Sequence, residues 1–220
     1  MSACVAASRL APALLLGLLV GCASGPPVPL RPVSMLGLRF EATVSQAFDY
    51  TCGAASVATV LTYYWNQPTT EADVIEVLKQ RYSLSEIAKR RDTGLSFDDL
   101  IFMAQKLGFS AQGAQVKLDQ LPQLKGPVIV QLVNPKFNHF VVLRRVGKGV
   151  YYVSDPIVGS RAMSAAEFQS EFSGNALAIW RPDTVLPLNP KLMQPRDGLS
   201  VTNSLKDVIN ATPWSPHPIL

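Results

Sequence analysis

Cys52 lies in the stretch DYTCGAAS, just before a run of small residues, and its thiol is the first candidate for chemistry in this chain. The residues from 52 to 64 have no polar face beyond small hydroxyl groups, which predicts a helix that is buried nearly all round. Cys52 would then lie in the first turn, where the helix dipole and the unpaired backbone N–H groups favour a thiolate over a thiol. A thiolate at this position could act as a nucleophile.

His139 is the best candidate for the base that such a nucleophile needs. The chain has two histidines, and the other one, His217, lies in a proline-rich terminal segment. His139 opens the apolar run HFVVL, Asp155 closes the run YYVSD, and the turn residues GKG lie between the two runs. This order predicts an antiparallel hairpin that brings His139 beside Asp155, so that the carboxylate could orient the imidazole.

Three further residues are assigned to the handling of a substrate. An oxyanion forms when a thiolate attacks a carbonyl carbon, and Gln46 together with the Cys52 backbone N–H could donate hydrogen bonds to it. Gly53 has no side chain and would let a substrate backbone approach the thiol, although a packing requirement at the helix start is the alternative explanation. Asn138 ends the loop that delivers His139, and it is assigned to substrate binding as well.

The order of the predicted elements indicates an α+β fold. Capping patterns at residues 70–73 and 96–99 predict two amphipathic helices, the first to about residue 82 and the second to Gly108. The runs GPVIVQLV, HFVVLRRV and GVYYVSDP predict antiparallel strands, Ser164 begins a capped helix, and NALAIW predicts one more strand. Helices come first and strands second, which favours a helix of Cys52 packed against an antiparallel sheet.

The four residues Gln46, Cys52, His139 and Asp155, within the motifs DYTCGAA, HFVVL and SDP, resemble the bacteriocin-processing, double-glycine-type peptidases, a branch of the papain-like cysteine peptidases. The resemblance spans about residues 36–180. It implies a papain-like fold with Cys52 as nucleophile and His139 as base. It further implies Asp155 as the orienting acid and Gln46 as the oxyanion donor, with no metal and no cofactor required.

The family also suggests what kind of substrate to expect. Its best-known members carry the peptidase domain fused to a membrane exporter and an ATPase, and they cut leader peptides after a Gly-Gly pair. A stand-alone exported member is more similar to the accessory peptidases of secretion or surface-fibre systems, including the Fap-type functional-amyloid systems of Gram-negative bacteria. The resemblance therefore implies an exported polypeptide as substrate and components of a secretion system as partners.

The start of the chain predicts export and lipid anchoring. The apolar stretch 10–20 is too short to span a bilayer, which is typical of a secretory signal. It ends in LVGC, which resembles the lipobox of bacterial lipoproteins and predicts a signal peptide over residues 1–21 and acylation of Cys22. Ala23 at the next position indicates the periplasmic face of the outer membrane in a Gram-negative host. An ordinary signal peptide or a short membrane tether, with Cys22 incidental, is the alternative.

Composition sets the remaining boundaries. A Pro-rich stretch at 22–35 predicts an extended tether, residues 36–181 the peptidase domain, and the Pro-rich residues 182–220 a wrapped or loosely ordered tail, in which 201–209 could form a short helix. The 48% hydrophobic content is too high for a chain that is disordered as a whole. The net charge of +4 is modest and the basic residues are scattered, which argues against nucleic-acid binding.

The predicted function is that of an exported, lipid-anchored cysteine peptidase. A catalytically silent module that binds or chaperones a polypeptide in the same groove is one alternative. A cell-wall amidase is another, although such enzymes usually show a Cys-Ser-Gly signature and a second catalytic histidine, whereas Gly53 follows Cys52 here. An inert core thiol needs no matched base, and a zinc site would normally bring a second cysteine, so both of these explanations are disfavoured.

Overall fold

A computed structural model of the chain describes residues 34–133, 138–182 and 190–193. The predicted signal peptide, the predicted lipidation site Cys22 and most of the predicted tether lie outside the described residues, and so do His217 and the possible helix at 201–209. The boundaries predicted at 21 and 35 and the lipid anchor therefore stay predictions.

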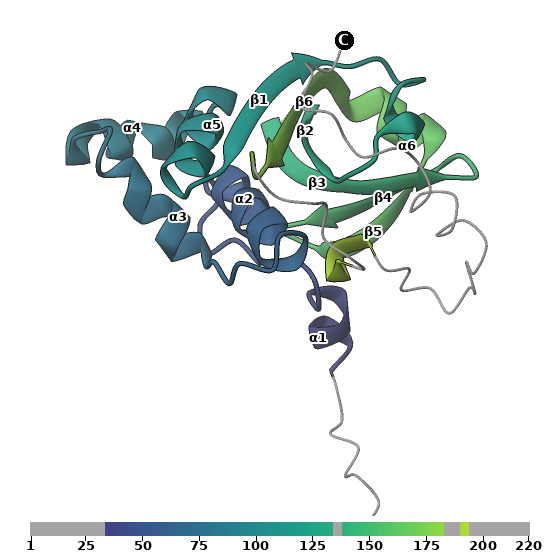
Figure 1. Ribbon diagram of the computed structural model, residues 1–220, viewed down its shortest axis with the longest axis horizontal. Helices are drawn as coiled ribbons and strands as arrows, with labels where there is room; N and C mark the ends of the chain where they lie inside the picture. Colours follow the sequence, from purple (N-terminus) through teal and green to yellow (C-terminus); the bar gives the residue numbers. More distant parts are fainter. Residues whose placement is uncertain (1–33, 134–137, 183–189, 194–220) are drawn as a thin grey trace, which may run out of the picture. The chain divides into compact units, whose positions relative to one another are not determined.

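The centre of the described part is a six-stranded sheet in the order β1-β6-β2-β3-β4-β5, in which every neighbouring pair is antiparallel (Figure 1). The strands are β1 (Ser110–Gln115), β2 (Val128–Val133), β3 (Asn138–Gly147), β4 (Val150–Asp155), β5 (Gly159–Ser164) and β6 (Phe172–Trp180). The antiparallel strands expected from the three apolar runs and from NALAIW are confirmed, and they are β2, β3, β4 and β6.

Helices precede the sheet in the chain, with one more helix between the last two strands. They are α1 (Met35–Arg39), α2 (Cys52–Tyr63), α3 (Glu71–Leu78), α4 (Leu84–Thr93), α5 (Phe97–Lys106) and α6 (Ala165–Glu171), with two 3-10 turns, η1 (Leu121–Gln123) and η2 (Lys191–Met193). Thr70 and Ser96 each form a capping box with the aspartate three residues later, as the sequence predicts for α3 and α5. The α+β architecture is therefore confirmed.

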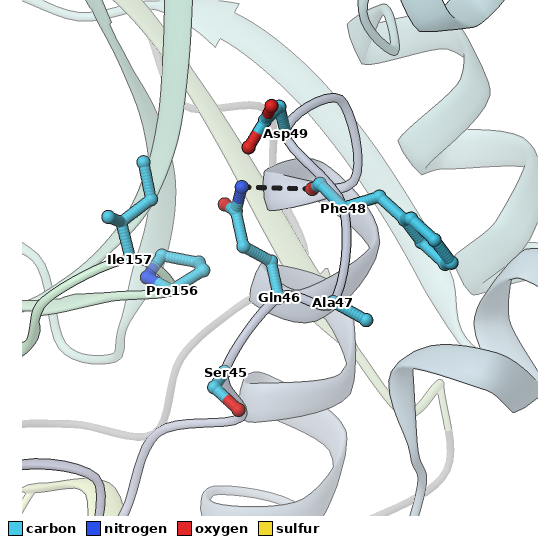
Figure 2. Close-up of a pocket in the computed structure, with 7 residues that line it drawn as sticks. All are labelled: Ser45, Gln46, Ala47, Phe48, Asp49, Pro156 and Ile157. Carbon is cyan, nitrogen blue, oxygen red and sulfur yellow. Dashed lines mark hydrogen bonds between the residues drawn. The ribbon is translucent and has the colours of Figure 1, made fainter.

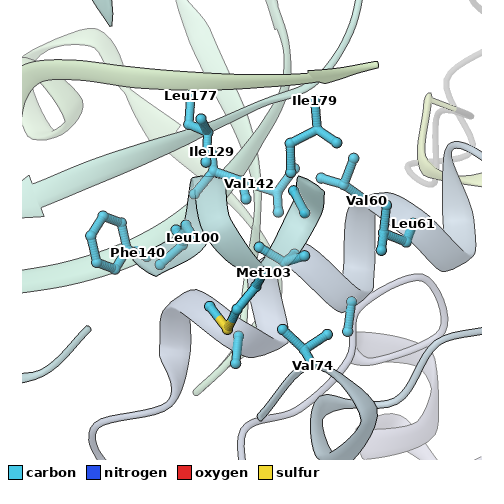
Figure 3. Packing of buried hydrophobic residues seen from close by; sticks show 14 of the residues in the cluster. Val60, Leu61, Val74, Leu100, Met103, Ile129, Phe140, Val142, Leu177 and Ile179 are labelled. Carbon is cyan, nitrogen blue, oxygen red and sulfur yellow. The ribbon is translucent and has the colours of Figure 1, made fainter. Parts of the chain in front are cut away.

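Two hydrophobic cores cover the two faces of the sheet. On one face α2, α3 and α5 pack against β2, β3 and β6, and Figure 3 shows Val60, Val74, Leu100, Met103, Ile129, Phe140, Val142 and Leu177 meeting there. On the other face, Phe168 of α6 and Leu121 of η1 pack against the alternate residues of the same strands. Because β2 and β3 are buried on both sides, their sequences are apolar runs without polar alternation.

A short segment of the predicted tail belongs to the core. Residues 190–193, here called the C-terminal strap, place Leu192 fully buried in the same cluster as α2. Arg144 of β3 is itself buried, and its Nε donates a 2.6 Å hydrogen bond to the Leu192 carbonyl oxygen. The core therefore extends past the boundary predicted at residue 181. Without Leu192, α2 and β3 would expose apolar surface where η2 packs against them.

Replacing Leu192 by Ala is expected to lower the free energy of unfolding by about 2–4 kcal/mol, since a fully buried leucine leaves a cavity in the core. Chemical denaturation of the chain measures the loss. Lys191→Ala is the matched control, because the exposed Lys191 makes two surface contacts, an ion pair with Glu41 at 3.5 Å and a cation–π contact 5.8 Å from the centre of the Tyr63 ring. Contacts of this kind at an exposed site contribute about 1 kcal/mol or less each. Equal effects of the two substitutions would contradict a structural role of the strap.

Candidate active site

Cys52 is the first residue of α2 and is 6% exposed. The residue before it, Thr51, does not cap the helix with its side chain. Its hydroxyl instead donates to the Phe48 carbonyl oxygen at 2.8 Å and accepts from the Phe48 N–H at 3.3 Å. The Thr51 side chain therefore does not compete for the N–H groups in the first turn of α2, which can stabilise a negative charge at Cys52.

His139 and Asp155 meet at the ends of the predicted hairpin. Strands β3 and β4 pair with Val142 opposite Ser154, and this register brings the first residues of β3 close to the last residue of β4. The distance from His139 Nε2 to Asp155 Oδ1 is 2.9 Å, and the two residues are 5% and 3% exposed. The proximity that the turn at residues 147–149 predicts is thus found, in a site largely closed to solvent.

The His139 ring also hydrogen-bonds the Cys52 side chain. Burial by itself lowers the pKa of His139, but the hydrogen bonds to Asp155 and Cys52 and their charges outweigh it and raise the pKa to about 9. The imidazole is therefore protonated at neutral pH. Helix α2, strand β3 and strand β4 thus each supply one member of a connected chain of thiol, imidazole and carboxylate.

Asp155 is held by more than His139. Its Oδ1 accepts from the N–H of Ile157 at 2.8 Å and of Val158 at 3.4 Å, and its Oδ2 lies 3.4 Å from Arg161 Nε. Burial raises the pKa of Asp155, whereas the hydrogen bond and the charge of His139, the Ile157 N–H and the Arg161 charge lower it, and the lowering wins. The carboxylate is therefore ionised at neutral pH.

The turn that presents these N–H groups depends on Gly159. Its φ is 85°, and a Cβ there would lie 2.6 Å from the Arg39 carbonyl oxygen. The sequence analysis predicted neither the hydrogen bonds from the turn to Asp155 nor the contact of Arg161 with Asp155. The signal available for the turn was the pair Asp155-Pro156 with Gly159 three residues further on, a pattern that favours a turn whose N–H groups face the aspartate.

Gln46 lies in the loop before α2, beside the residue that follows Asp155. Its backbone N–H donates to the Pro156 carbonyl oxygen at 3.0 Å, and its Nε2 donates to the Phe48 carbonyl oxygen at 2.9 Å. Its Oε1 is buried and has no hydrogen-bond partner among the described residues. The Ala47 N–H fixes the same loop to α3 by donating to both carboxylate oxygens of Glu71, at 3.1 and 2.9 Å.

A pocket of about 220 Å³ opens at this loop (Figure 2). Its lining comes from the loop before α2 and from the turn after Asp155: Ser45, Gln46, Ala47, Phe48, Asp49, Pro156 and Ile157. The Gln46 amide group points toward the Phe48 carbonyl oxygen in this view. In this structure the Gln46 Nε2 donates to the Phe48 carbonyl oxygen, and its role as oxyanion donor stays a prediction.

For Gly53 the structure favours packing over substrate approach. A Cβ built at Gly53 would lie 2.7 Å from Leu100 Cδ1 and 3.2 Å from Phe140 Cδ2, so the missing side chain makes room for the core. The packing alternative is therefore favoured, because the direction in which a side chain would point faces β3 and α5, and the assignment of Gly53 to substrate binding stays a prediction. Asn138 is exposed and pairs with Val133 at the start of β3, next to His139, where its assignment to substrate binding stays a prediction.

The described residues contain no group of three or more His, Cys, Asp or Glu that could hold a metal ion. Within the same residues, no helix has both the length and the apolar character needed to cross a bilayer.

Comparison with solved structures places this arrangement in a known class of fold. The peptidase domain of Streptococcus ComA, a bifunctional ABC transporter involved in quorum sensing, superposes with a TM-score of 0.55 at 23% sequence identity, over 64% of this chain and 98% of that domain. The helix of Cys52 packed on an antiparallel sheet that carries His139 and Asp155 is the papain-like cysteine peptidase fold.

The family follows from the sequence itself. Residues 41–184 match the model of the Peptidase C39 family, and the chain belongs to this family of cysteine peptidases. A probable functional amyloid protease, FapD, of Pseudomonas aeruginosa is 34% identical over 141 residues, which are 64% of this chain and 61% of that protein. The colicin V secretion and processing ATP-binding protein CvaB of Escherichia coli is 29% identical over 151 residues, 67% of this chain and 20% of that protein.

Proposed function

We propose that the chain is an exported cysteine peptidase that cleaves a secreted polypeptide by an acyl-enzyme mechanism. The connected side chains of Cys52, His139 and Asp155 are the observation that carries this proposal. Membership of the Peptidase C39 family supports the reaction class. The chain spans about 61% of the length of the FapD relative, so the activity of the whole protein is part of the proposal.

Each of these residues has one step in the proposed mechanism. Since His139 Nε2 faces Asp155, Nδ1 is the ring nitrogen left for the thiol, and the imidazolium stabilises the thiolate of Cys52. The thiolate attacks the scissile carbonyl carbon, and the Cys52 N–H with Gln46 stabilises the oxyanion. His139 then gives its proton to the leaving amine as the C–N bond breaks. Water, deprotonated by His139, hydrolyses the thioester and restores the thiol pair.

The proposed substrate is a polypeptide of a secretion or surface-fibre system, and in particular an amyloid-forming one. Similarity to a protein named as a probable functional amyloid protease supports the amyloid class, and similarity to a colicin secretion and processing protein supports an exported polypeptide in general. The lipid anchor at Cys22, the location on the periplasmic face of the outer membrane and association with secretion components belong to the same proposal.

The purified chain should cut a candidate amyloid subunit, an accessory protein of its secretion system or a double-glycine leader peptide at a defined bond, which mass spectrometry identifies. The Cys52→Ala variant is the control. Binding of these polypeptides without any cleavage would favour the silent binding module instead. Release of peptides from peptidoglycan with no cleavage of polypeptides would favour the cell-wall amidase.

Anchoring is tested separately in a Gram-negative host. Incorporation of labelled palmitate into the chain, lost in a Cys22→Ala variant, is the expected result. Equal labelling of the two chains, or none in either, would contradict acylation at Cys22 without affecting the proposed chemistry at Cys52.

A further inference from the structure

Arg161 is a charged residue beside the site to which nothing above assigns a function. It lies on β5, the strand next to β4, and pairs in register with Val153. Its Nε is 3.4 Å from Asp155 Oδ2, and its Nη1 is 3.7 Å from Glu167 Oε1 on α6. The guanidinium group therefore bridges the buried carboxylate of the site and a carboxylate at the surface.

The two oxygens of Asp155 have different partners. Oδ1 accepts from His139 and from the N–H groups of the following turn, whereas Oδ2 faces Arg161. Because a carboxylate is planar, a cation at Oδ2 limits rotation of the group and so directs Oδ1 at the imidazole. Arg161 Nε is buried and has no hydrogen-bond partner among the described residues, so its contact with Asp155 is an ion pair.

Charge arguments lead to the same residue. The ionisable groups that act on Asp155 are His139 from β3 and Arg161 from β5. Below the pKa of the carboxylate, His139 loses the negative partner that favours its imidazolium form. A fixed positive charge close to Asp155 delays that loss to lower pH. The Arg161 side chain is 28% exposed, so solvent weakens this effect but does not remove it.

We propose that Arg161 is a positioning residue for the thiol pair: it holds Asp155 in the ionised and oriented form and thereby extends the reactive range of Cys52 toward acidic pH. The inference rests on the proposed function, because it needs Cys52 and His139 to act as a pair. A purely structural role is the competing explanation, since Arg161 also links β5 to α6 through Glu167. The two explanations differ in their effect on pH dependence.

The test is the rate of Cys52 alkylation by iodoacetamide between pH 4 and pH 10 in the full chain, with peptide mapping to isolate Cys52 from Cys4 and Cys22. Arg161→Gln removes the charge, and Arg161→Lys keeps it. Lys79→Gln is the matched control, since it removes one positive charge from an exposed pair with Glu76 at the end of α3. Thermal unfolding of each variant reports stability separately.

Arg161→Gln is expected to move the acidic limb of the alkylation profile up by about one pH unit, Arg161→Lys to restore most of that shift, and Lys79→Gln to cause none. A lower unfolding temperature of Arg161→Gln together with an unchanged alkylation profile would overturn the positioning role and leave the structural one. An ordinary thiol profile in the unmodified chain would instead overturn the proposed function, and the inference with it.

Discussion

Replacement of Cys52 by Ala is expected to reduce peptide-bond cleavage by a factor on the order of 10⁴ or more. In the proposed mechanism the Cys52 thiolate forms the covalent intermediate, and the described residues contain no second cysteine that could replace it. Because Cys52 is small and lies at the start of α2, the free energy of unfolding should change by only about 1 kcal/mol. Cleavage assays with a polypeptide that the unmodified chain cuts, together with chemical denaturation, measure both quantities.

Cys52→Ser is the matched control for this prediction. Serine nearly keeps the size and position of the side chain, but its hydroxyl group is a far weaker acid than a thiol. The variant should therefore retain the fold and bind substrate, and it should cleave the substrate at least about 10³-fold more slowly. Substantial cleavage by the Ala variant would show that the chemistry belongs to another residue or to a contaminating peptidase.

Asp155→Asn should have the second largest effect, and chiefly on pH dependence. Asparagine is nearly the same size and its Oδ1 can still accept from the Ile157 N–H, but the negative charge beside His139 is lost. Without that charge, burial lowers the pKa of His139 from about 9 toward or below its ordinary 6.5. The alkaline limit of cleavage should therefore fall by one to two pH units, and the rate at pH 8 by about 10- to 100-fold.

The imidazole signals in an NMR titration measure this change directly. The chain has two histidines, so a His217→Ala variant assigns the His139 resonance without ambiguity. An identical titration midpoint for His139 in the Asp155→Asn variant would contradict the coupling of the two groups.

The free energy of unfolding should depend on pH through the same two groups, His139 and Asp155. The pKa of His139 is raised by folding, so its contribution is fully present below pH 6.5 and is lost as the pH rises through about 9. The pKa of Asp155 is lowered by folding, so its contribution is present above about pH 4 and is lost on acidification through the lowered value. Both contributions are complete between about pH 4 and 6.5, and the Asp155→Asn variant should lose stability within that range.

Local patterns predict much of the fold because they act over short distances. The capping boxes of α3 and α5, the apolar runs of the buried strands and the turn at 147–149 are each visible in a few adjacent residues. The hairpin then determines that His139 and Asp155 meet. Antiparallel pairing links residues at the two strand ends whatever the rest of the chain does.

The elements that the sequence did not predict lack an apolar pattern. Strands β1 and β5 lie at the two edges of the sheet and have the sequences SAQGAQ and GSRAMS, in which few side chains are buried. Helix α4 has no buried residue, and only its capping box of Ser83 and Glu86 marks its start. The two edge strands owe their structure to the strands with which they pair, and their own sequences contain little information about it.

The unpredicted parts of the site depend on contacts between distant segments. Arg161 approaches Asp155 because β5 pairs with β4. Leu192 lies in the core because its side chain packs in the cluster of α2 and its carbonyl oxygen accepts a hydrogen bond from Arg144. Gly53 could be read as a substrate contact or as a packing residue, and only the positions of Leu100 and Phe140 decide between the two. Residue type and spacing alone contain none of these contacts.

The central proposal is that Cys52 and His139 act together as nucleophile and base. The most direct measurement is the rate of Cys52 alkylation as a function of pH in the unmodified chain and in His139→Ala. The account predicts rapid labelling that persists well below pH 8 in the unmodified chain and falls by at least about tenfold at pH 6 in the variant. Slow labelling with an ordinary thiol profile, equal in the two chains, would contradict it.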